Sequence, residues 1–363
     1  MNRQSQNYLW PLLFVLLLAI IAVFSLKAKQ DDSHKPTFIL GWKSATSFIE
    51  PRRALASATY NGYLYVLGGI DAENNYVRAV EYSKINADGS LNKWQKTSPL
   101  NEGRFYLAAA ASNGYLFAIG GAKGALGESN IPVATVEKAR INPDGSLGRW
   151  LLSDDLTTPR RGLTVNQHGN RIYALGGYNG IFLHSIEQAT VNKNGQLSEW
   201  TLSPQHSTVD RYIHSSAIAG KNLYLLAGHM KNDQTVSYGD VELSQISDSG
   251  ALSPWHIENT TLLTPRFIAA AFSLRNYLYI VAGHDGAKRL DSIEFAALDK
   301  AGHVGRWQLT APLTTARSGT ATVTHNQRVY VLGGINQNRV LNSVETAIQT
   351  ADGDLGYFSA VIR

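Results

Sequence analysis

The chain has 363 residues, of which 44% are hydrophobic and 17% are charged, and its formal net charge is +5. It contains no cysteine, which excludes disulfides, thiolate metal sites, thiol nucleophiles and a lipid-modified cysteine. The low charge and the single long apolar run exclude a disordered chain and a polytopic membrane protein. The net charge is too small for this length to indicate nucleic-acid binding, and length alone suggests about two domains.

The long apolar run extends over residues 9–26 and follows a short tail, residues 1–8. As a helix its eighteen residues would span about 27 Å, close to the hydrocarbon thickness of a bilayer. We therefore expect an uncleaved, single-pass transmembrane signal-anchor, with the membrane as a partner. The alternative is a cleaved signal peptide with a poor cleavage site at residues 23–25, which would make the protein secreted.

A polar linker is expected at residues 27–36, followed by a large domain over residues 37–363. A short tail before such a domain predicts export, to the periplasm or the cell surface. The domain contains six copies of one unit with a period of 50 to 56 residues.

Four positions define the unit. Each copy opens with an arginine: Arg52, Arg104, Arg160, Arg211, Arg266 and Arg317. An alternating aromatic–aliphatic segment follows and ends in a glycine: Gly69, Gly121, Gly177, Gly228, Gly283 and Gly334. A Val-Glu or Ile-Glu pair comes next, with the glutamates Glu81, Glu137, Glu187, Glu242, Glu294 and Glu345. The copy ends at an aromatic residue: Trp94, Trp150, Trp200, Trp255, Trp307 and Phe358.

Four short strands per unit, with tight Asp-Gly or Asn-Gly turns before the last one, fit one blade of a β-propeller. The pattern resembles the kelch repeat, and the resemblance covers residues 37–363. It implies an all-β, six-bladed kelch-type propeller. The departures are few: Ala227 and Ala282 replace the first glycine of the Gly-Gly pair, Phe117 replaces a tyrosine, and Phe358 replaces the tryptophan.

The ring can be closed in two ways, because there are seven candidate outer strands for six blades. Trp42 precedes Arg52 by ten residues, the same interval as in several later copies. We therefore expect residues 37–51 to supply the closing strand of blade six, with Trp42 as its structural tryptophan. Phe358 has the same spacing from Glu345 as the other tryptophans from their glutamates, and residues 358–363 are expected outside that strand or as a cap.

The spacings distinguish the two faces of the predicted disc. The arginine-to-glycine interval is seventeen residues and the glutamate-to-aromatic interval thirteen in all six copies, whereas the glycine-to-glutamate interval varies from ten to sixteen. Variable loops on one face of a repeat array are where binding sites are usually built. The candidate loops are 70–78, 122–134, 178–184, 229–239, 284–291 and 335–342.

The six arginines open the innermost strands, so two interpretations of them remain open. They could surround the channel mouth as donors for carboxylate or phosphate; the resemblance implies this, because kelch domains that bind acidic peptides use arginines near the start of inner strands. Alternatively, each could pair with a strand-three glutamate and be structural. Arg53 and Arg161 occur in only two blades, which makes them better ligand-binding candidates than the ring, of which we retain Arg211.

Three histidines are further candidates. His229 and His284 follow the Ala-Gly pairs of two neighbouring blades, and His214 lies on an inner strand where other copies have leucine, alanine or threonine. Convergent histidines could bind a metal or act in acid–base chemistry. Histidines scattered in loops are more common than sites, so no metal and no cofactor are expected.

The sequence contains no recognisable nucleophile or acid–base pair, so the leading hypothesis is a binding module for a protein or carbohydrate ligand. The alternative is an exported carbohydrate-active enzyme resembling the sialic acid mutarotases, which are also kelch propellers. A copper-radical oxidase resembling galactose oxidase is excluded, because its tyrosine–cysteine cofactor needs a cysteine. No nucleic-acid partner is expected.

Overall fold

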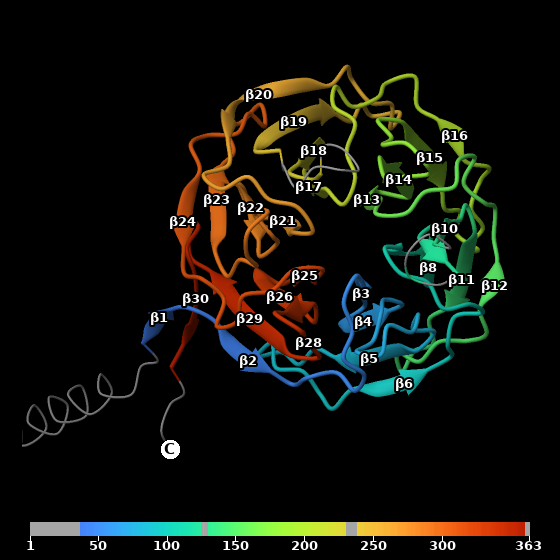
Figure 1. Cartoon of the computed structure of the whole chain (residues 1–363), viewed down its shortest axis with the longest axis horizontal. Helices are drawn as coiled ribbons and strands as arrows, with labels where there is room; N and C mark the ends of the chain where they lie inside the picture. The colour runs from blue at the N-terminus through green and yellow to red at the C-terminus, as the bar shows by residue number, and fades with distance from the viewer. Residues whose placement is uncertain (1–36, 125, 127–129, 230–237, 360–363) are drawn as a thin grey trace, which may run out of the picture. The chain divides into compact units, whose positions relative to one another are not determined.

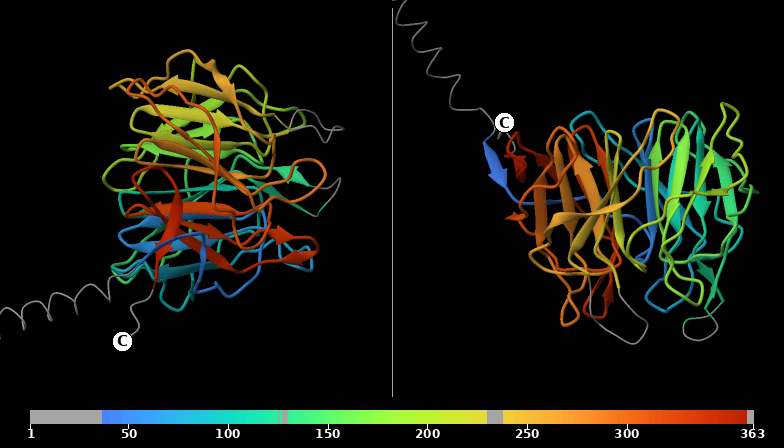
Figure 2. Two further views of the ribbon diagram at one scale, coloured as in Figure 1. Left: turned by 90° about the vertical axis from the view of Figure 1, so that its left-hand side faces the viewer. Right: turned by 90° about the horizontal axis from the view of Figure 1, so that it is seen from above.

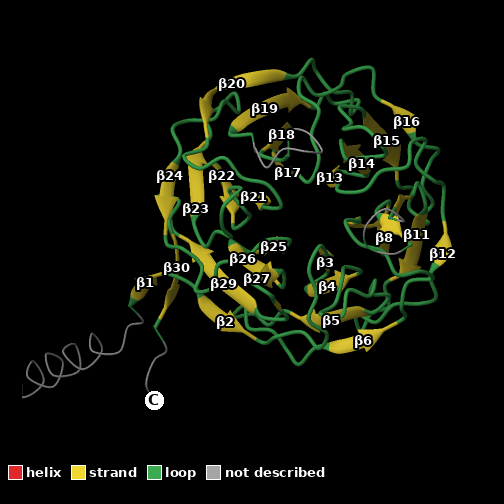
Figure 3. Ribbon diagram, in the orientation of Figure 1, coloured by secondary structure: helices red, strands yellow, loops and turns green. Residues whose placement is uncertain are grey.

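The structure is a computed structural model that describes residues 37–124, 126, 130–229 and 238–359. Within these residues the secondary structure consists of strands and loops without a helix (Figure 3). The expected anchor over residues 9–26 and the linker over residues 27–36 lie outside the described part. No helix of the described residues is long and apolar enough to cross a membrane.

Residues 41–356 form one compact unit of six antiparallel sheets arranged around a central channel (Figure 1). Blade one consists of β3 (Ala56–Tyr60), β4 (Tyr63–Leu67), β5 (Val80–Lys84) and β6 (Gln95–Thr97). Blade two consists of β7 (Ala108–Ser112), β8 (Tyr115–Ile119), β11 (Val136–Arg140) and β12 (Leu151–Leu152). Blade three consists of β13 (Thr164–His168), β14 (Arg171–Leu175), β15 (Ile186–Thr190) and β16 (Thr201–Leu202).

The second half of the ring repeats this plan. Blade four consists of β17 (Ser215–Ala219), β18 (Asn222–Leu226), β19 (Asp240–Gln245) and β20 (His256–Thr261). Blade five consists of β21 (Ala270–Leu274), β22 (Tyr277–Val281), β23 (Ile293–Ala297) and β24 (Gln308–Thr310). Blade six contains β25 (Ala321–His325), β26 (Arg328–Leu332), β29 (Val344–Gln349), β2 (Lys43–Ala45) and β30 (Leu355–Phe358). The expected six-bladed, all-β propeller is therefore confirmed.

The variable loops carry small ribbons of their own. The loop after β8 contains the pair β9 (Ala122–Lys123) and β10 (Ile131–Pro132), and the loop after β26 contains β27 (Ile335–Asn336) and β28 (Arg339–Val340). The β27–β28 ribbon and the 284–291 loop extend from the same face of the disc (Figure 2). This face lies opposite the uniform hairpins that join strands three and four.

Blades are joined by contacts that repeat around the ring. The second strand of each blade is buried, and the tyrosine hydroxyl at its centre donates to the glycine carbonyl in the strand three–four turn of the next blade: Tyr65 to Gly145, Tyr173 to Gly250, Tyr224 to Gly302, Tyr279 to Gly353 and Tyr330 to Gly89, at 2.6–2.8 Å. Blade two has Phe117 at this position, and Lys138 Nζ donates to the Gly195 carbonyl instead, at 3.0 Å. The missing hydroxyl is thus replaced by an ammonium group from the neighbouring strand.

The N-terminal strand occupies the outer position of blade six. β2 pairs with β29 so that Ser44 faces Glu345, the same register in which Lys96 faces Glu81 in blade one. Trp42 is 5% exposed and its indole Nε1 donates to the Ala311 carbonyl at 3.0 Å. β30 pairs with the far end of β29, through Ile348–Gly356 and Gln349–Leu355.

The two candidate aromatics for the closing strand differ in burial. Phe358 does not take the place of the buried tryptophan, because Trp42 fills it and Phe358 is 51% exposed. Residues 37–40, which include β1 (Phe38–Leu40), form a separate small unit with residues 357–359. In that unit the Phe38 and Phe358 rings lie 5.3 Å apart, and Ser359 N donates to the Thr37 carbonyl at 2.8 Å.

Two closed rings of backbone hydrogen bonds surround the channel. In the first, the second glycine of each blade donates to the carbonyl of the repeat arginine in the next blade, and Gly334 to Arg52 closes the circle at 3.0 Å. In the second, the residue two places after each arginine donates to its counterpart in the preceding blade, at 2.8–3.2 Å: Ala54, Tyr106, Gly162, Ile213, Ile268 and Gly319. All six have φ between +48° and +61°, the left-handed region. This inner ring defines the neck of the channel.

Candidate functional site

The six repeat arginines are buried and do not present free guanidinium groups to the channel. Each pairs with the strand-three glutamate of its own blade: Arg52–Glu81, Arg104–Glu137, Arg160–Glu187, Arg211–Glu242, Arg266–Glu294 and Arg317–Glu345. All twelve residues are at most 3% exposed. Of the two interpretations left open by the sequence, the structure shows the paired arrangement.

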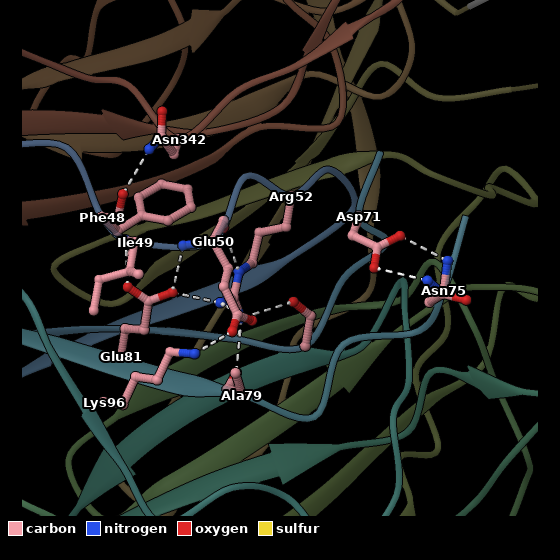
Figure 4. A network of polar contacts seen from close by, with 11 residues as sticks. Phe48, Ile49, Glu50, Arg52, Asp71, Asn75, Ala79, Glu81, Lys96 and Asn342 are labelled. Atoms are coloured by element: carbon pink, nitrogen blue, oxygen red, sulfur yellow. Dashed lines mark hydrogen bonds and ion pairs between the residues drawn. The ribbon is translucent and has the colours of Figure 1, made fainter. Parts of the chain in front are cut away.

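Blade one shows how the arginine and glutamate of one pair are bonded (Figure 4). Arg52 Nη2 lies 2.6 Å from Glu81 Oε1, and Nη1 donates to the Ala79 carbonyl at 2.7 Å. The Glu81 carboxylate also accepts the backbone N–H groups of Ile49 and Glu50. Burial lowers the pKa of Arg52 from its usual value, and the glutamates oppose this shift. A buried, fully bonded ion pair of this kind joins the blade connection to strand three.

Arg211 belongs to this structural set. It contacts both Glu242 at 2.9 Å and Asp240 at 2.8 Å, and its guanidinium lies 5.0 Å from the Tyr238 ring centre. Its side chain is 1% exposed. It therefore has no open face for a ligand, unlike the other arginines proposed from the sequence.

Four of the sequence candidates come together in one layer at the mouth of the channel. In each blade the residue after the repeat arginine pairs through its backbone with the residue after the second glycine. These rim pairs are Arg53–Ile70, Phe105–Ala122, Arg161–Tyr178, Tyr212–His229, Phe267–His284 and Ser318–Ile335. We call these twelve residues the rim. Arg53, Arg161, His229 and His284 all belong to it.

Arg53 and Arg161 lie close to a shared tyrosine. Burial raises the pKa of Tyr106, and both Arg53 and Arg161 oppose the shift electrostatically. Arg53 Nη2 donates to Asn74 Oδ1 at 3.1 Å, while the guanidinium of Arg161 lies 4.8 Å from the Tyr178 ring centre. The Nε atoms of both arginines are buried and have no hydrogen-bond partner among the described residues. The Nε atoms of Arg160 and Arg289 are likewise without a partner among the described residues.

Aromatic side chains that the sequence did not single out continue from these arginines around the rim. Arg161 also lies 5.5 Å from the Tyr212 ring centre, and Tyr212 contacts Tyr178 at 5.4 Å and Phe182 at 5.9 Å. Gly162 is required for this packing, because a Cβ there would lie 2.4 Å from the Tyr212 ring. The sequence signal for these residues is their position: the residue after the constant arginine varies between blades and is Arg, Phe, Arg, Tyr, Phe and Ser in blades one to six.

The three candidate histidines do not converge on one point. The Phe267 ring lies 5.2 Å from the His229 ring and 5.3 Å from the His284 ring. The Nδ1 atom of His284 accepts the Gly286 N–H at 3.0 Å, so it acts as a turn cap. His214 lies deeper, where its Nε2 is 3.0 Å from the Thr164 hydroxyl. This arrangement does not assemble a metal site at the rim.

Below the rim the channel holds a cavity of about 190 Å³. Its wall is formed by the first residues of the inner strands, including the neck residues and His214. Burial, with Arg211 and Arg160 nearby, lowers the pKa of His214 to about 3. The imidazole is therefore neutral at physiological pH and a weak base.

We expect His214 to make the protein acid-sensitive. Because its folded pKa lies below its ordinary value of 6.5, the unfolded chain takes up the proton first, and stability falls as the pH drops from about 6.5 towards 3. His214→Leu, which installs the residue found in blades one to three, should remove about 1.4 kcal/mol per pH unit from this slope. Urea unfolding between pH 7 and 4 measures it. Equal slopes for wild type and His214→Leu would contradict the assignment.

Comparison with known proteins agrees with this architecture. A model of the Kelch motif matches residues 159–188 and 316–345, in blades three and six. The chain is 29% identical over 126 residues to Kelch-like protein 13 of Homo sapiens, covering 35% of this chain and 18% of that protein. It is 23% identical over 256 residues to beta-scruin of Limulus polyphemus, covering 69% of this chain and 26% of that protein. The matched segments thus span about a quarter or less of these relatives.

Among solved structures, the one titled "Structure of YjhT" superposes with a TM-score of 0.65 at 14% identity, covering 87% of this chain and 99% of that chain. At this identity the similarity concerns the fold alone. The six blades share one four-stranded plan, and Kelch motifs are matched in blades three and six.

Proposed function

We propose that the chain is a binding module that holds a carboxylate-bearing ligand, on a protein or a carbohydrate, at the rim of the propeller. The observation that carries this proposal is the pair of rim arginines, Arg53 and Arg161, whose buried Nε atoms have no partner among the described residues. A guanidinium group donates two parallel hydrogen bonds to a carboxylate. Arg161 lies over the Tyr178 and Tyr212 rings, and both arginines interact electrostatically with Tyr106, so aromatic contact area lies next to the charges.

A third arginine also favours a negatively charged ligand. Arg289, in the 284–291 loop, also has a buried Nε without a partner in the described part of the chain. Its backbone pairs with His284 at the rim. The repeat glutamates are already bonded to the repeat arginines, so they do not neutralise Arg53, Arg161 or Arg289. The rim is therefore suited to an anionic partner.

We further propose that residues 9–26 tether the propeller to a membrane and that the propeller lies outside the cytoplasm, in the periplasm or at the cell surface. The support is the length and apolarity of that run, thirteen of whose eighteen residues are Leu, Ile, Val or Phe. Cleavage after the run would release the same propeller as a secreted protein.

Charge reversal at both rim arginines should abolish most of the binding. A charge-assisted hydrogen bond contributes about 1.5–3 kcal/mol, so Arg53→Glu with Arg161→Glu should weaken binding at least about a hundredfold. We would measure binding of the full chain to a peptide library with one fixed glutamate, and to the same library with glutamine instead. Wild type should prefer the glutamate library, and the double variant should lose this preference while its unfolding midpoint stays the same.

The matched control is Arg306→Glu. Arg306 is an exposed arginine before Trp307, near the strand three–four turn of blade five on the opposite face. Arg306→Glu changes the net charge by the same amount as one rim reversal. It therefore distinguishes a local effect on ligand binding from long-range electrostatic attraction of the ligand. Retention of the glutamate preference by the double rim variant would refute the proposal.

The second candidate function is a carbohydrate-active enzyme resembling the sialic acid mutarotases. The observation that favours it is the combination of arginines and aromatic rings at one mouth, which also suits an acidic sugar. The low pKa of His214 argues against that residue as its general base at neutral pH. Proton NMR of anomer exchange in N-acetylneuraminate tests it, and a rate equal to that of buffer would dismiss it.

A further inference from the structure

We propose that His256, Glu258 and His303 form a binding site for a zinc-class divalent cation at the junction of blades four and five. The ligand atoms of these three side chains all lie within 4.8 Å of one another. The site lies away from the rim, because His256 begins β20 directly after Trp255 and His303 lies in the turn between β23 and β24. It therefore involves none of the residues proposed to bind the acidic ligand.

Both imidazoles lie against one oxygen of the Glu258 carboxylate, at separations near those between the ligands of one ion. His256 Nε2 lies 2.9 Å and His303 Nδ1 lies 3.2 Å from the same oxygen, Glu258 Oε1. Ligand atoms around a tetrahedral zinc ion with bonds of about 2.0–2.2 Å are about 3.3 Å apart. The other carboxylate oxygen, Oε2, accepts the Val304 N–H at 2.9 Å, which orients Oε1 towards the imidazoles. Both imidazole side chains are about half exposed, at 48% and 58%, so water can complete the coordination.

The charge at this position also favours a cation. The Glu258 side chain is 4% exposed, and in the described part of the chain its ion-pair contacts are with the two imidazoles alone. A buried carboxylate charge is costly unless it is compensated. Asp299 adds a second carboxylate next to His303, whose backbone N–H it accepts at 2.9 Å. A divalent ion would compensate the charge of Glu258 directly.

Comparison between blades shows that the fold does not require histidine or glutamate at these positions. The residue three places after the tryptophan accepts a backbone N–H from the next blade, and a threonine does this elsewhere: Thr97 from Leu147 at 2.7 Å and Thr310 from Leu355 at 3.2 Å. Blade four uses Glu258 for the same contact. The positions equivalent to His256 in the other blades hold Lys43, Gln95, Leu151, Thr201 and Gln308. At these equivalent positions, two imidazoles and a carboxylate are combined only at the junction of blades four and five.

The donor set specifies the class of ion. Two imidazole nitrogens and one carboxylate oxygen suit Zn²⁺, and also Ni²⁺ or Cu²⁺, whereas Ca²⁺ and Mg²⁺ prefer sites made only of oxygen. An ion bound here would link the outer strand of blade four to the turn of blade five. Binding to the folded state alone raises the unfolding midpoint with metal concentration.

The test uses the untagged full chain, treated with a chelator and dialysed. We would titrate it with ZnCl₂ by calorimetry, record the visible absorption of the Co²⁺ form, and measure thermal unfolding with and without zinc. We expect one equivalent of zinc, a cobalt spectrum typical of nitrogen and oxygen ligands, and a midpoint that rises with zinc. His256→Ala and His303→Ala should each weaken binding at least about tenfold.

Two further variants keep the outcome interpretable. Glu258→Thr reproduces the contact of blades one and five, so it should fold and lose the metal response. His184→Ala is the matched control, because His184 is an exposed histidine whose Nδ1 lies 2.6 Å from one carboxylate, Asp210, in blade three. It should bind zinc as wild type does. Wild-type affinity no tighter than that of Glu258→Thr, or an equal loss in His184→Ala, would overturn the proposal.

Discussion

Glu187→Gln should destabilise the propeller by about 3–5 kcal/mol, because it leaves the Arg160 guanidinium buried without its counter-charge. Arg160 is fully buried, and its Nη2 lies 2.7 Å from Glu187 Oε1. The carboxylate also accepts the N–H groups of Thr157 and Thr158, at 2.6 and 3.1 Å. The substitution keeps the size and the acceptor oxygen of the side chain, so the loss reports the charge. Urea unfolding at pH 7 measures it.

The double variant Arg160→Met with Glu187→Gln distinguishes the contribution of the ion pair to stability from the cost of leaving one charge unpaired. Removing both charges leaves no unpaired ion, so the double variant should be more stable than the sum of the two single losses predicts. The exposed pair Lys221–Asp248 is the control, and Lys221→Ala should cost no more than about 1 kcal/mol. A loss below about 1 kcal/mol for Glu187→Gln would mean that the buried pair is not essential to the blade.

These pairs explain which part of the site the sequence could predict. In all six copies the repeat arginine lies seventeen residues before a glycine and the repeat glutamate thirteen residues before an aromatic residue. A residue required in every blade is identified by this repetition. The same repetition indicates packing rather than recognition, because a binding site uses the blades unequally. The residues that differ between copies at a constant position, such as Arg53 and Arg161, are the informative ones, and the structure places them together at the rim.

The rest of the site is formed by residues from different blades. Spacing along the chain does not show which of these residues lie together in space. Tyr106 and Tyr212 are more than a hundred residues apart in sequence, yet their rings lie 6.2 Å apart over the channel. The same limit applies to His256 and His303, which belong to different blades. The depth of His214 within the cavity, and the burial that lowers its pKa, likewise follow from the radius of the channel and not from local sequence.

The closure of the ring shows another limit of prediction from the sequence, because two segments satisfied the same pattern. Trp42 and Phe358 both have the spacing of the blade tryptophan, and periodicity alone does not choose between them. The structure distinguishes them by burial: Trp42 packs with Phe272, Tyr279 and Leu355, whereas Phe358 is half exposed. An edge left open at β29 would expose unpaired backbone groups, so the choice of closing strand has energetic consequences.

Trp42→Ala should therefore be among the most damaging single substitutions, with a loss of about 3–5 kcal/mol. It removes a buried indole, its hydrogen bond to Ala311, and the packing that holds β2 against β29. Phe358→Ala removes an aromatic ring of the same repeat position but from an exposed site, so it should change stability by less than about 0.5 kcal/mol. Chemical unfolding of the full chain, followed by tryptophan fluorescence in the Phe358 variant and by circular dichroism in both, measures the two values.

Trp94→Ala provides the reference for this comparison, because Trp94 is the equivalent residue of blade one, 2% exposed, with its Nε1 donating to the Thr46 carbonyl at 2.8 Å. If the N-terminal strand is a full member of blade six, Trp42→Ala and Trp94→Ala should cost the same within about 1 kcal/mol. A ring closed by the C-terminal segment would reverse the order, with Phe358→Ala costly and Trp42→Ala tolerated. The pairing of β2 with Val344, Glu345 and Thr346 in the register of the other blades requires the first result.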